Sequence, residues 1–227
     1  MKHYFNHIEN HIDAFGKVKE NQNVSSSLQA AVALGKSLLG CTISVHGKSF
    51  IIRMLELYYG GAGDDGHDWH RTHYQYKTSK NRHRTAVQSK EGLAVYLSAE
   101  NVEDTYTRMD IVAGNEGVAV SFLLRSVWND SFDRIGTYAG SPNKVLNALG
   151  FKPDDHGKLI AIDQPADIYI DTSDREEFIK SKGLTILFRK RINLKSTFED
   201  QHKVWLNMFL EKNVPGTNQY SLTYTRP

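Results

Sequence analysis

One glutamate lies inside an apolar, strand-like run, and it limits the ways in which that run can be buried. Glu56 stands between two leucines within residues 50–59, and the run breaks into the glycine-rich segment 60–67. An isolated carboxylate is costly to bury, so Glu56 must be paired, protonated or pointed into a wet pocket at the end of its strand. The glycines favour the pocket, because small residues let a ligand approach the backbone. The alternative is an edge strand on which Glu56 faces water and pairs with Arg53.

Helical and strand-like patterns occupy much of the rest of the chain. A helix is predicted from about residue 25, where Ser25 to Ser27 offer an N-cap, to Gly40, where the helical apolar pattern stops. The tripeptide 46–48 has hairpin chemistry and joins two predicted strands, 42–45 and 50–59. Further strands are predicted at 92–98, 108–113, 118–127, 168–171 and 184–190, with a helix at 143–149 and the last regular element at 203–209.

Composition indicates one soluble domain. The chain has 227 residues, of which 40% are hydrophobic, and no linker-like stretch interrupts it, so we expect a domain over 25–227 after an appendage over 1–24. Its single cysteine, Cys41, excludes an intrachain disulfide framework and is interpreted as a small buried hydrophobe. Neither a run of about 18 apolar residues nor a signal-peptide core is visible. We therefore expect a cytoplasmic monomer without a membrane partner.

Two basic tracts stand out although the net charge is only +2. The first contains Lys77, Lys80, Arg82 and Arg84 among hydroxyl and amide side chains, and the second contains Arg189, Lys190, Arg191 and Lys195. Cations together with hydroxyls and amides are the groups that contact phosphate backbones. Each tract alone is more simply a solvated surface. Two tracts on one domain, with tyrosines near the first, favour a nucleic-acid partner.

A cluster of aspartates and histidines in residues 64–73 invites a metal interpretation, but we expect no metal. Three histidines at intervals of three share a helix face only loosely, and the glycine and threonine content argues against a helix there. Phosphate-binding loops, dinucleotide fingerprints and nucleophile elbows are also missing from the sequence. The sequence therefore predicts neither a metal nor a cofactor.

Several short segments, taken in order, resemble the alkyladenine (3-methyladenine) DNA glycosylase family. They are 34–40 (LGKSLLG), 55–60 (LELYYG) with His67, 78–82 (TSKNR), 92–97 (GLAVYL), 109–111 (MDI), 122–125 (FLLR) and 140–144 (GSPNK). Each segment is weak alone, but their collinear order is specific, and the resemblance covers residues 28–150 best. It implies a single α+β domain whose curved, mostly antiparallel sheet is flanked by helices.

The resemblance also implies a reaction and a set of residues. Glu56 corresponds to the group that activates the water attacking the sugar, and Arg125 to its positioning partner. Tyr58, His67 and Tyr96 correspond to the walls that hold a flipped base, which fits the need of such an enzyme for a carboxylate and an aromatic slot. No amine is needed, so a monofunctional enzyme of base excision is implied, with DNA as its partner. The alternatives are core aromatics, a turn histidine and a strand-end ion pair.

Two departures from the family leave other functions open. Asp110 stands where the family has a pocket asparagine, and its carboxylate would accept N–H groups or favour a cationic purine, unless it pairs outside the pocket with Arg108 or Arg125. Residues 98–106 are acidic where the family has a tyrosine-rich wedge, and acidic residues oppose phosphate binding. The alternatives are a hydrolase of free nucleotides or single-stranded nucleic acid, and a catalytically silent binder of modified bases.

Overall fold

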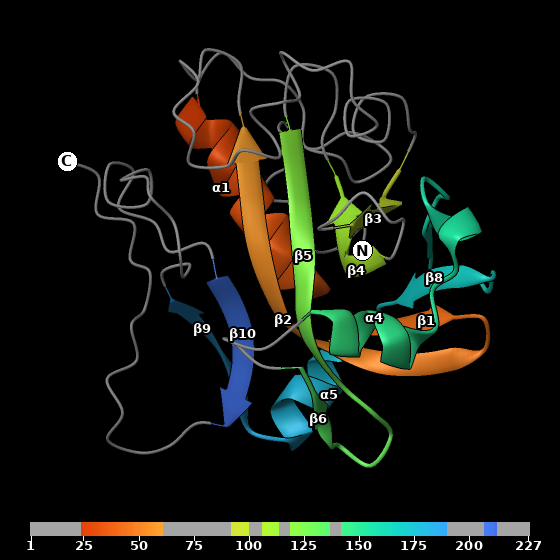
Figure 1. The fold of residues 1–227 in the computed structure, drawn as a ribbon. Coiled ribbons are helices and arrows are strands. Elements are labelled where there is room, and N and C mark those ends of the chain that lie inside the picture. Colours follow the sequence, from red (N-terminus) through yellow and green to blue (C-terminus); the bar gives the residue numbers. More distant parts are fainter. Residues whose placement is uncertain are drawn as a thin grey trace.

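The chain folds as a mixed α+β structure, as predicted (Figure 1). The computed structural model describes residues 24–60, 92–99, 106–113, 119–136, 142–189 and 207–212. The helices of this part are α1 (Val24–Leu38), α4 (Asn143–Leu149), α5 (Arg175–Ser181) and the short 3-10 helix η1 (Pro153–Asp155). The strands are β1 (Thr42–Val45), β2 (Lys48–Gly60), β3 (Ala94–Ala99), β4 (Tyr106–Val112), β5 (Ala119–Trp128), β6 (Arg134–Ile135), β7 (Ala161–Ile162), β8 (Ile168–Asp171), β9 (Leu184–Arg189) and β10 (Asn207–Lys212).

The sheet branches at the long strand β2. One edge of β2 pairs with β5 along most of its length. Its other edge pairs first with β1, at residues 48–51, and then with β10, at residues 54–56. The order β3-β4-β5-β2-β1-β8-β7 therefore has a branch through β10 to β9, and every pairing except β7 with β8 is antiparallel. β2 is thus a central strand, and the edge-strand alternative for Glu56 is wrong.

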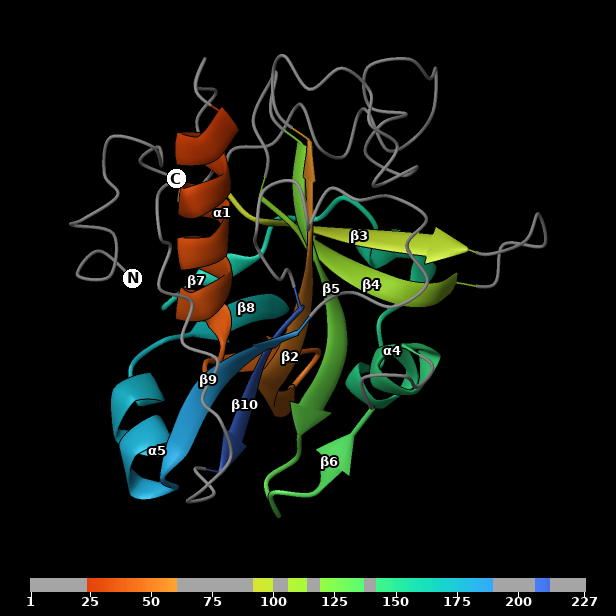
Figure 2. The ribbon, with the colours of Figure 1, turned by 90° about the vertical axis from the view of Figure 1, so that its left-hand side faces the viewer.

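The two faces of β2 and β5 are covered by different helices. Figure 2 shows α1 on one side of these strands and α4 on the other. On the α1 side, Leu55 and Leu57 join Phe122 and Met208 in the main core. The helix packs closely there, because a Cβ atom on Gly35 would lie 2.4 Å from a Met208 methyl and 2.7 Å from the Phe122 ring. Strand alternation turns Glu56 to the opposite face, on the side of α4.

The β1–β2 hairpin follows directly from its sequence. His46 and Gly47 both have positive φ, at 49° and 81°, as a two-residue turn that follows the twist of the strands requires. Lys48 already pairs with Val45, so the turn is one residue shorter than the predicted tripeptide.

The C-terminus of α1 is held by a side chain from far along the chain. Arg175 donates from Nε to the Leu39 carbonyl at 2.7 Å and from Nη2 to the Lys36 carbonyl at 2.8 Å. These carbonyls have no partner within the helix, and a cation also suits the negative end of the helix dipole. Cys41 follows this end and is buried, as predicted, and burial raises the pKa of its thiol to about 12.

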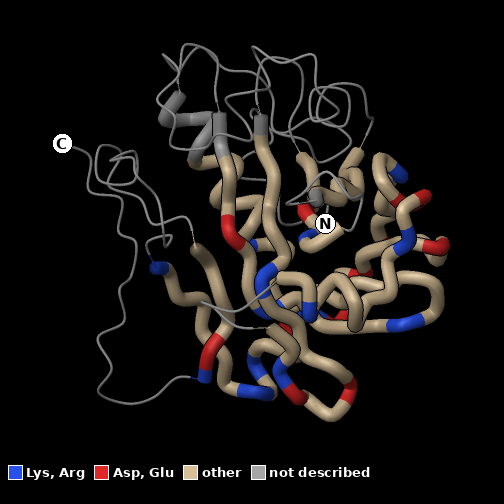
Figure 3. The backbone as a smooth tube through the Cα atoms, in the orientation of Figure 1, with Lys and Arg blue, Asp and Glu red and all other residues tan. Residues whose placement is uncertain are grey.

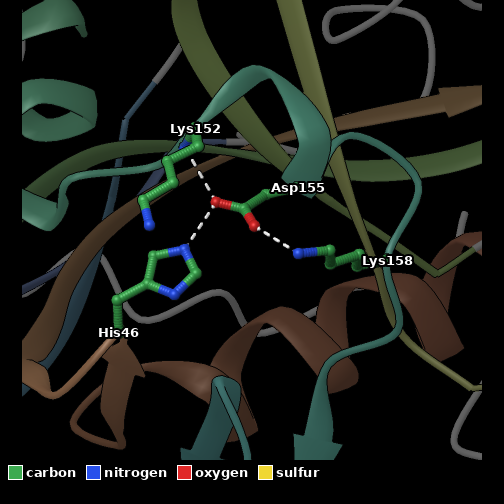
Figure 4. A network of polar contacts seen from close by, with 4 residues as sticks. All are labelled: His46, Lys152, Asp155 and Lys158. Carbon is green, nitrogen blue, oxygen red and sulfur yellow. Dashed lines mark hydrogen bonds and ion pairs between the residues drawn. The ribbon is translucent and has the colours of Figure 1, made fainter.

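A buried aspartate ties the β1–β2 hairpin to η1 (Figure 4). Asp155 is fully buried and accepts hydrogen bonds from the Lys152 amide at 2.7 Å, His46 Nε2 at 2.8 Å and Lys158 Nζ at 2.8 Å. The segment just after η1 runs along the outer edge of β3, where Gly157 donates to the Val95 carbonyl at 2.8 Å. The contacts of Asp155 therefore help to cover an edge of the sheet.

Replacing Asp155 with asparagine is expected to lower the free energy of unfolding by about 2 kcal/mol at pH 7, because charge-assisted hydrogen bonds are lost from a buried group. Burial raises the pKa of Asp155, but hydrogen bonds from Lys158, Lys152 and His46 outweigh it, so the net pKa is lowered. This stabilisation is present above the ordinary pKa of an aspartate, about 3.9, and is lost as the pH falls through the lowered value. Urea unfolding of the wild type and of Asp155→Asn at pH 7 and pH 3 tests this prediction. If the difference in unfolding free energy between the two proteins is as large at pH 3 as at pH 7, the prediction is wrong.

Three details of the fold differ from the sequence-based predictions. α1 begins at Val24, so the serines proposed as its N-cap lie inside its first turn. Glu56 does not lie at a strand end, because β2 continues to Gly60. The short elements β6, β7 and α5 were not predicted, because two-residue strands and a seven-residue helix carry too few residues to show a period.

Candidate active site

One row of directly opposed residues crosses six strands of the sheet and contains three of the predicted site residues, Glu56, Tyr96 and Asp110. In strand order from β3 to β9, the row is Tyr96, Asp110, Leu123, Glu56, Asn207 and Arg189. Directly opposed residues of antiparallel strands point to the same face. The register therefore brings residues from distant parts of the sequence to the face opposite α1.

Glu56 is 2% exposed and lies at the centre of a set of hydrogen-bond donors. Its Oε2 accepts hydrogen bonds from two nitrogens of Arg125, Nε at 3.0 Å and Nη2 at 2.8 Å. The same oxygen accepts a hydrogen bond from Asn207 Nδ2 at 3.3 Å. Its Oε1 accepts the Tyr58 hydroxyl. Three donors fill Oε2, whereas Oε1 keeps a lone pair that no described residue uses. Arg53 does not pair with Glu56, because it forms an ion pair with Glu211 at 2.6 Å.

Tyr58 lies two residues after Glu56 on the same face of β2 and is 7% exposed. Burial raises the pKa of Tyr58, and the neighbouring Glu56 charge raises it further. The hydroxyl therefore stays protonated and acts as a donor to Glu56 over the range in which proteins work. Tyr58 is therefore a buried aromatic that also donates a hydrogen bond to the carboxylate.

Asp110 is 4% exposed and does not make the alternative ion pair with Arg108 or Arg125. The Ser121 hydroxyl donates to Asp110 Oδ2 at 3.1 Å, and Oδ1 is buried without a hydrogen-bond partner among the described residues. Burial raises the pKa of Asp110 to about 6; Glu56 also raises it, while Arg108, Ser121 and Arg125 lower it. Asp110 is therefore a carboxyl group whose charge changes near neutral pH.

Tyr96 lies on the same face of the sheet as Glu56 but three strands away. This spacing places the backbones of the two residues about 14 Å apart. Its ring packs edge-on against His156, with 5.0 Å between ring centroids, and Tyr106 stacks on the same imidazole at 6.2 Å. The structure thus places Tyr96 in an aromatic group at one end of the row and not in contact with the carboxylate.

Several predicted residues lie outside the described part of the chain. They are His67, the tract with Lys77, Lys80, Arg82 and Arg84, and the acidic residues between Ala99 and Tyr106. From the second tract only Arg189 is described; it is exposed, and its guanidinium lies 4.7 Å from the centre of the Phe209 ring. The strands that precede and follow residues 100–105, β3 and β4, pair antiparallel.

Asn207 is the site residue that sequence reasoning missed. It is fully buried in β10, donates to Glu56 and has an Oδ1 atom without a hydrogen-bond partner among the described residues. The sequence does contain a clue of the same kind as for Glu56, because Asn207 is a lone polar residue in the apolar run 204–210. A buried amide in a strand must be satisfied by a partner or a ligand.

Charge and metal-ligand groups elsewhere point to no second site in the described part. Figure 3 shows basic and acidic positions interspersed along it, without a long stretch of one sign. The described residues contain no group of three histidine, cysteine or acidic side chains placed to hold a metal ion. None of the described helices is long and apolar enough to cross a membrane.

Comparison with models of protein families finds no match to this sequence, and comparison with curated proteins finds none either. The geometry of the site therefore carries the functional argument.

Proposed function

We propose that the protein is a monofunctional DNA glycosylase that hydrolyses the N-glycosidic bond of alkylated or otherwise modified purines in base excision. The observation that carries the proposal is the Glu56 carboxylate, which is buried, is fixed by three side chains and keeps one lone pair on Oε1 that none of the described residues uses. A carboxylate held in this way suits proton transfer from a water molecule. The family resemblance adds support, because its segments 55–60, 92–97, 109–111 and 122–125 all fall on adjacent strands.

In the proposed reaction, Glu56 accepts a proton from water as the oxygen bonds to the anomeric carbon of the sugar. The bond from that carbon to the purine nitrogen breaks, and its electron pair leaves with the base. A cationic alkylated purine leaves as a neutral molecule, so it needs no added proton. Arg125 fixes the carboxylate, and Tyr58, Tyr96 and His67 are proposed to hold the base after it has been flipped from the helix. The fold is accordingly proposed to be glycosylase-like.

Base release from defined substrates tests this function. Duplex, single-stranded and free-nucleotide substrates that carry an alkylated purine are incubated with the protein, and the products are identified by mass. We expect the free base and an intact sugar-phosphate strand, since a monofunctional enzyme does not cleave the backbone. Absence of free base from all three substrates would rule the function out.

A hydrolase of free nucleotides or of single-stranded nucleic acid is the second candidate. It is favoured by Glu100, Glu103 and Asp104, which lie in the β3–β4 connection that would face a duplex in the resembling family. Acidic groups at that place repel phosphates. Preferential release from free or single-stranded substrates in the same assay identifies this function.

Binding to DNA is expected to depend on the first basic tract. Replacing both Lys80 and Arg82 with alanine should weaken binding to all sequences alike and reduce the slope of log affinity against log salt by about two, one for each phosphate contact. Fluorescence anisotropy across a salt series measures both quantities. Lys48 and Lys180 are exposed on the described part, so their double alanine variant is a control of equal charge. If the two double variants weaken binding equally, the first basic tract contributes only as general surface charge and not as a specific contact with DNA.

A further inference from the structure

Asn207 lies beside Glu56 in the cross-strand row, at the point where β10 pairs with β2. It is fully buried, and its Nδ2 lies 3.3 Å from Glu56 Oε2. A carboxylate only accepts hydrogen bonds, so the amide must turn its NH2 group toward Glu56. This fixes the orientation of the amide, which would otherwise be ambiguous. Its oxygen is therefore presented on the other side of the amide.

The amide oxygen of Asn207 lacks a hydrogen-bond donor among the described residues. Asn207 Oδ1 is buried and has no hydrogen-bond partner among the described residues, and leaving such an acceptor unpaired costs about 1–3 kcal/mol. Amide geometry separates Oδ1 from Nδ2 by about 2.3 Å, and the two oxygens of a carboxylate are about 2.2 Å apart, so Oδ1 lies no more than about 5.6 Å from Glu56 Oε2 and no more than about 7.8 Å from Oε1. One water molecule with two hydrogen bonds of about 2.8 Å joins oxygens up to about 5.6 Å apart, a separation within this range. Buried waters typically occupy sites of this kind, between polar groups that lack partners.

We propose that Asn207 is a positioning residue that accepts the second hydrogen of the water activated by Glu56. This inference rests on the proposed glycosidic hydrolysis and adds a residue to it. One O–H bond of the water points to Oε1 of Glu56, whose second lone pair no described residue uses, and the other points to Oδ1 of Asn207. As the water oxygen bonds to the anomeric carbon, the first proton passes to Glu56 and the second remains on the new hydroxyl group.

Two acceptors make the site selective for water over alcohols. Water has two O–H donors and satisfies both oxygens, whereas methanol has one donor and leaves Asn207 Oδ1 unpaired. The cost of an unpaired buried acceptor, about 1–3 kcal/mol, corresponds to roughly 5- to 150-fold discrimination. A residue that served only to pack β10 against β2 would not produce this selectivity.

The partition between water and methanol as nucleophile tests the inference. Base release is run in a series of methanol concentrations, and the ratio of methyl glycoside to free sugar is measured by mass spectrometry. Asn207→Leu keeps the approximate shape but removes the acceptor, so the ratio of methanolysis to hydrolysis should rise about tenfold or more over the wild type. Asn207→Asp keeps an acceptor oxygen at the same place, so it should retain a preference for water although its overall rate falls.

A high-resolution crystal structure of the wild-type protein provides a test that needs no activity. We expect an ordered water within hydrogen-bond distance of both Asn207 Oδ1 and the Glu56 carboxylate. No water bonded to Oδ1, or an unchanged partition ratio in a folded Asn207→Leu protein, overturns the inference. A bridging water together with no base release from any substrate supports the water site and rejects the glycosylase function, so the two failures are distinguishable.

Discussion

Replacing Glu56 with glutamine is expected to reduce base release by about 10²- to 10⁴-fold, which is the usual loss when a general base is removed. The amide keeps the shape of the carboxylate but cannot accept a proton from water. Its oxygen can still accept the donors of Arg125 and Asn207, and its NH2 group can donate to the Tyr58 oxygen once that hydroxyl has turned. The site should therefore remain folded, and nucleic-acid binding should be nearly unchanged.

Single-turnover base release and binding affinity, measured on the same preparations, separate the two effects. Tyr58→Phe is the matched control, because it removes one donor to Glu56 while the carboxylate stays in place. We expect it to slow base release much less than Glu56→Gln does. Full turnover by Glu56→Gln would show that another group activates the water, even if the protein were a glycosylase.

The sequence predicted those parts of the fold that depend on local patterns. The helix before Gly40, the hairpin at His46 and Gly47, and the helix α4 all follow from capping residues, turn residues and spacing of apolar side chains. The branch of the sheet at β2 could not be read in the same way. Strand β10 pairs with β2 across about 150 intervening residues, and sequence patterns carry no information on which distant strand becomes a neighbour.

In the candidate site, too, the sequence indicates single residues but not which of them come into contact. Glu56 could be found because a charge in an apolar run needs an explanation, and the same argument applies to Asn207. Their contact with each other and with Arg125 depends on the register of three strands, which only the structure supplies. The position of Arg175 at the end of α1 was equally hidden, because an arginine in a polar segment resembles any surface cation.

Asp110 is expected to make substrate choice depend on pH. Burial raises the pKa of Asp110 to about 6, so the group is mostly ionised at pH 7.5 and mostly protonated at pH 5. When ionised, it attracts a cationic alkylated purine and accepts N–H groups; when protonated, Oδ1 can donate to a base that offers only acceptors. The ratio of kcat/KM for a cationic lesion to that for a neutral lesion should therefore fall as the pH is lowered from 7.5 to 5. We expect a change of about tenfold, the equivalent of about 1.4 kcal/mol of charge interaction in a partly screened site.

Asp110→Asn removes the charge at constant volume and is expected to make this ratio independent of pH, at a value near that of the wild type at pH 5. Ser121→Ala is the informative control, because it keeps the carboxylate and removes a hydrogen bond that lowers the pKa of Asp110. In that variant the ratio should still change with pH, but its midpoint should move to higher pH. General effects of pH on the reaction rate or on DNA binding act on both lesions and cancel in the ratio. A ratio that responds neither to pH nor to Asp110→Asn would remove Asp110 from base recognition, and its buried Oδ1 would then need a partner other than the substrate.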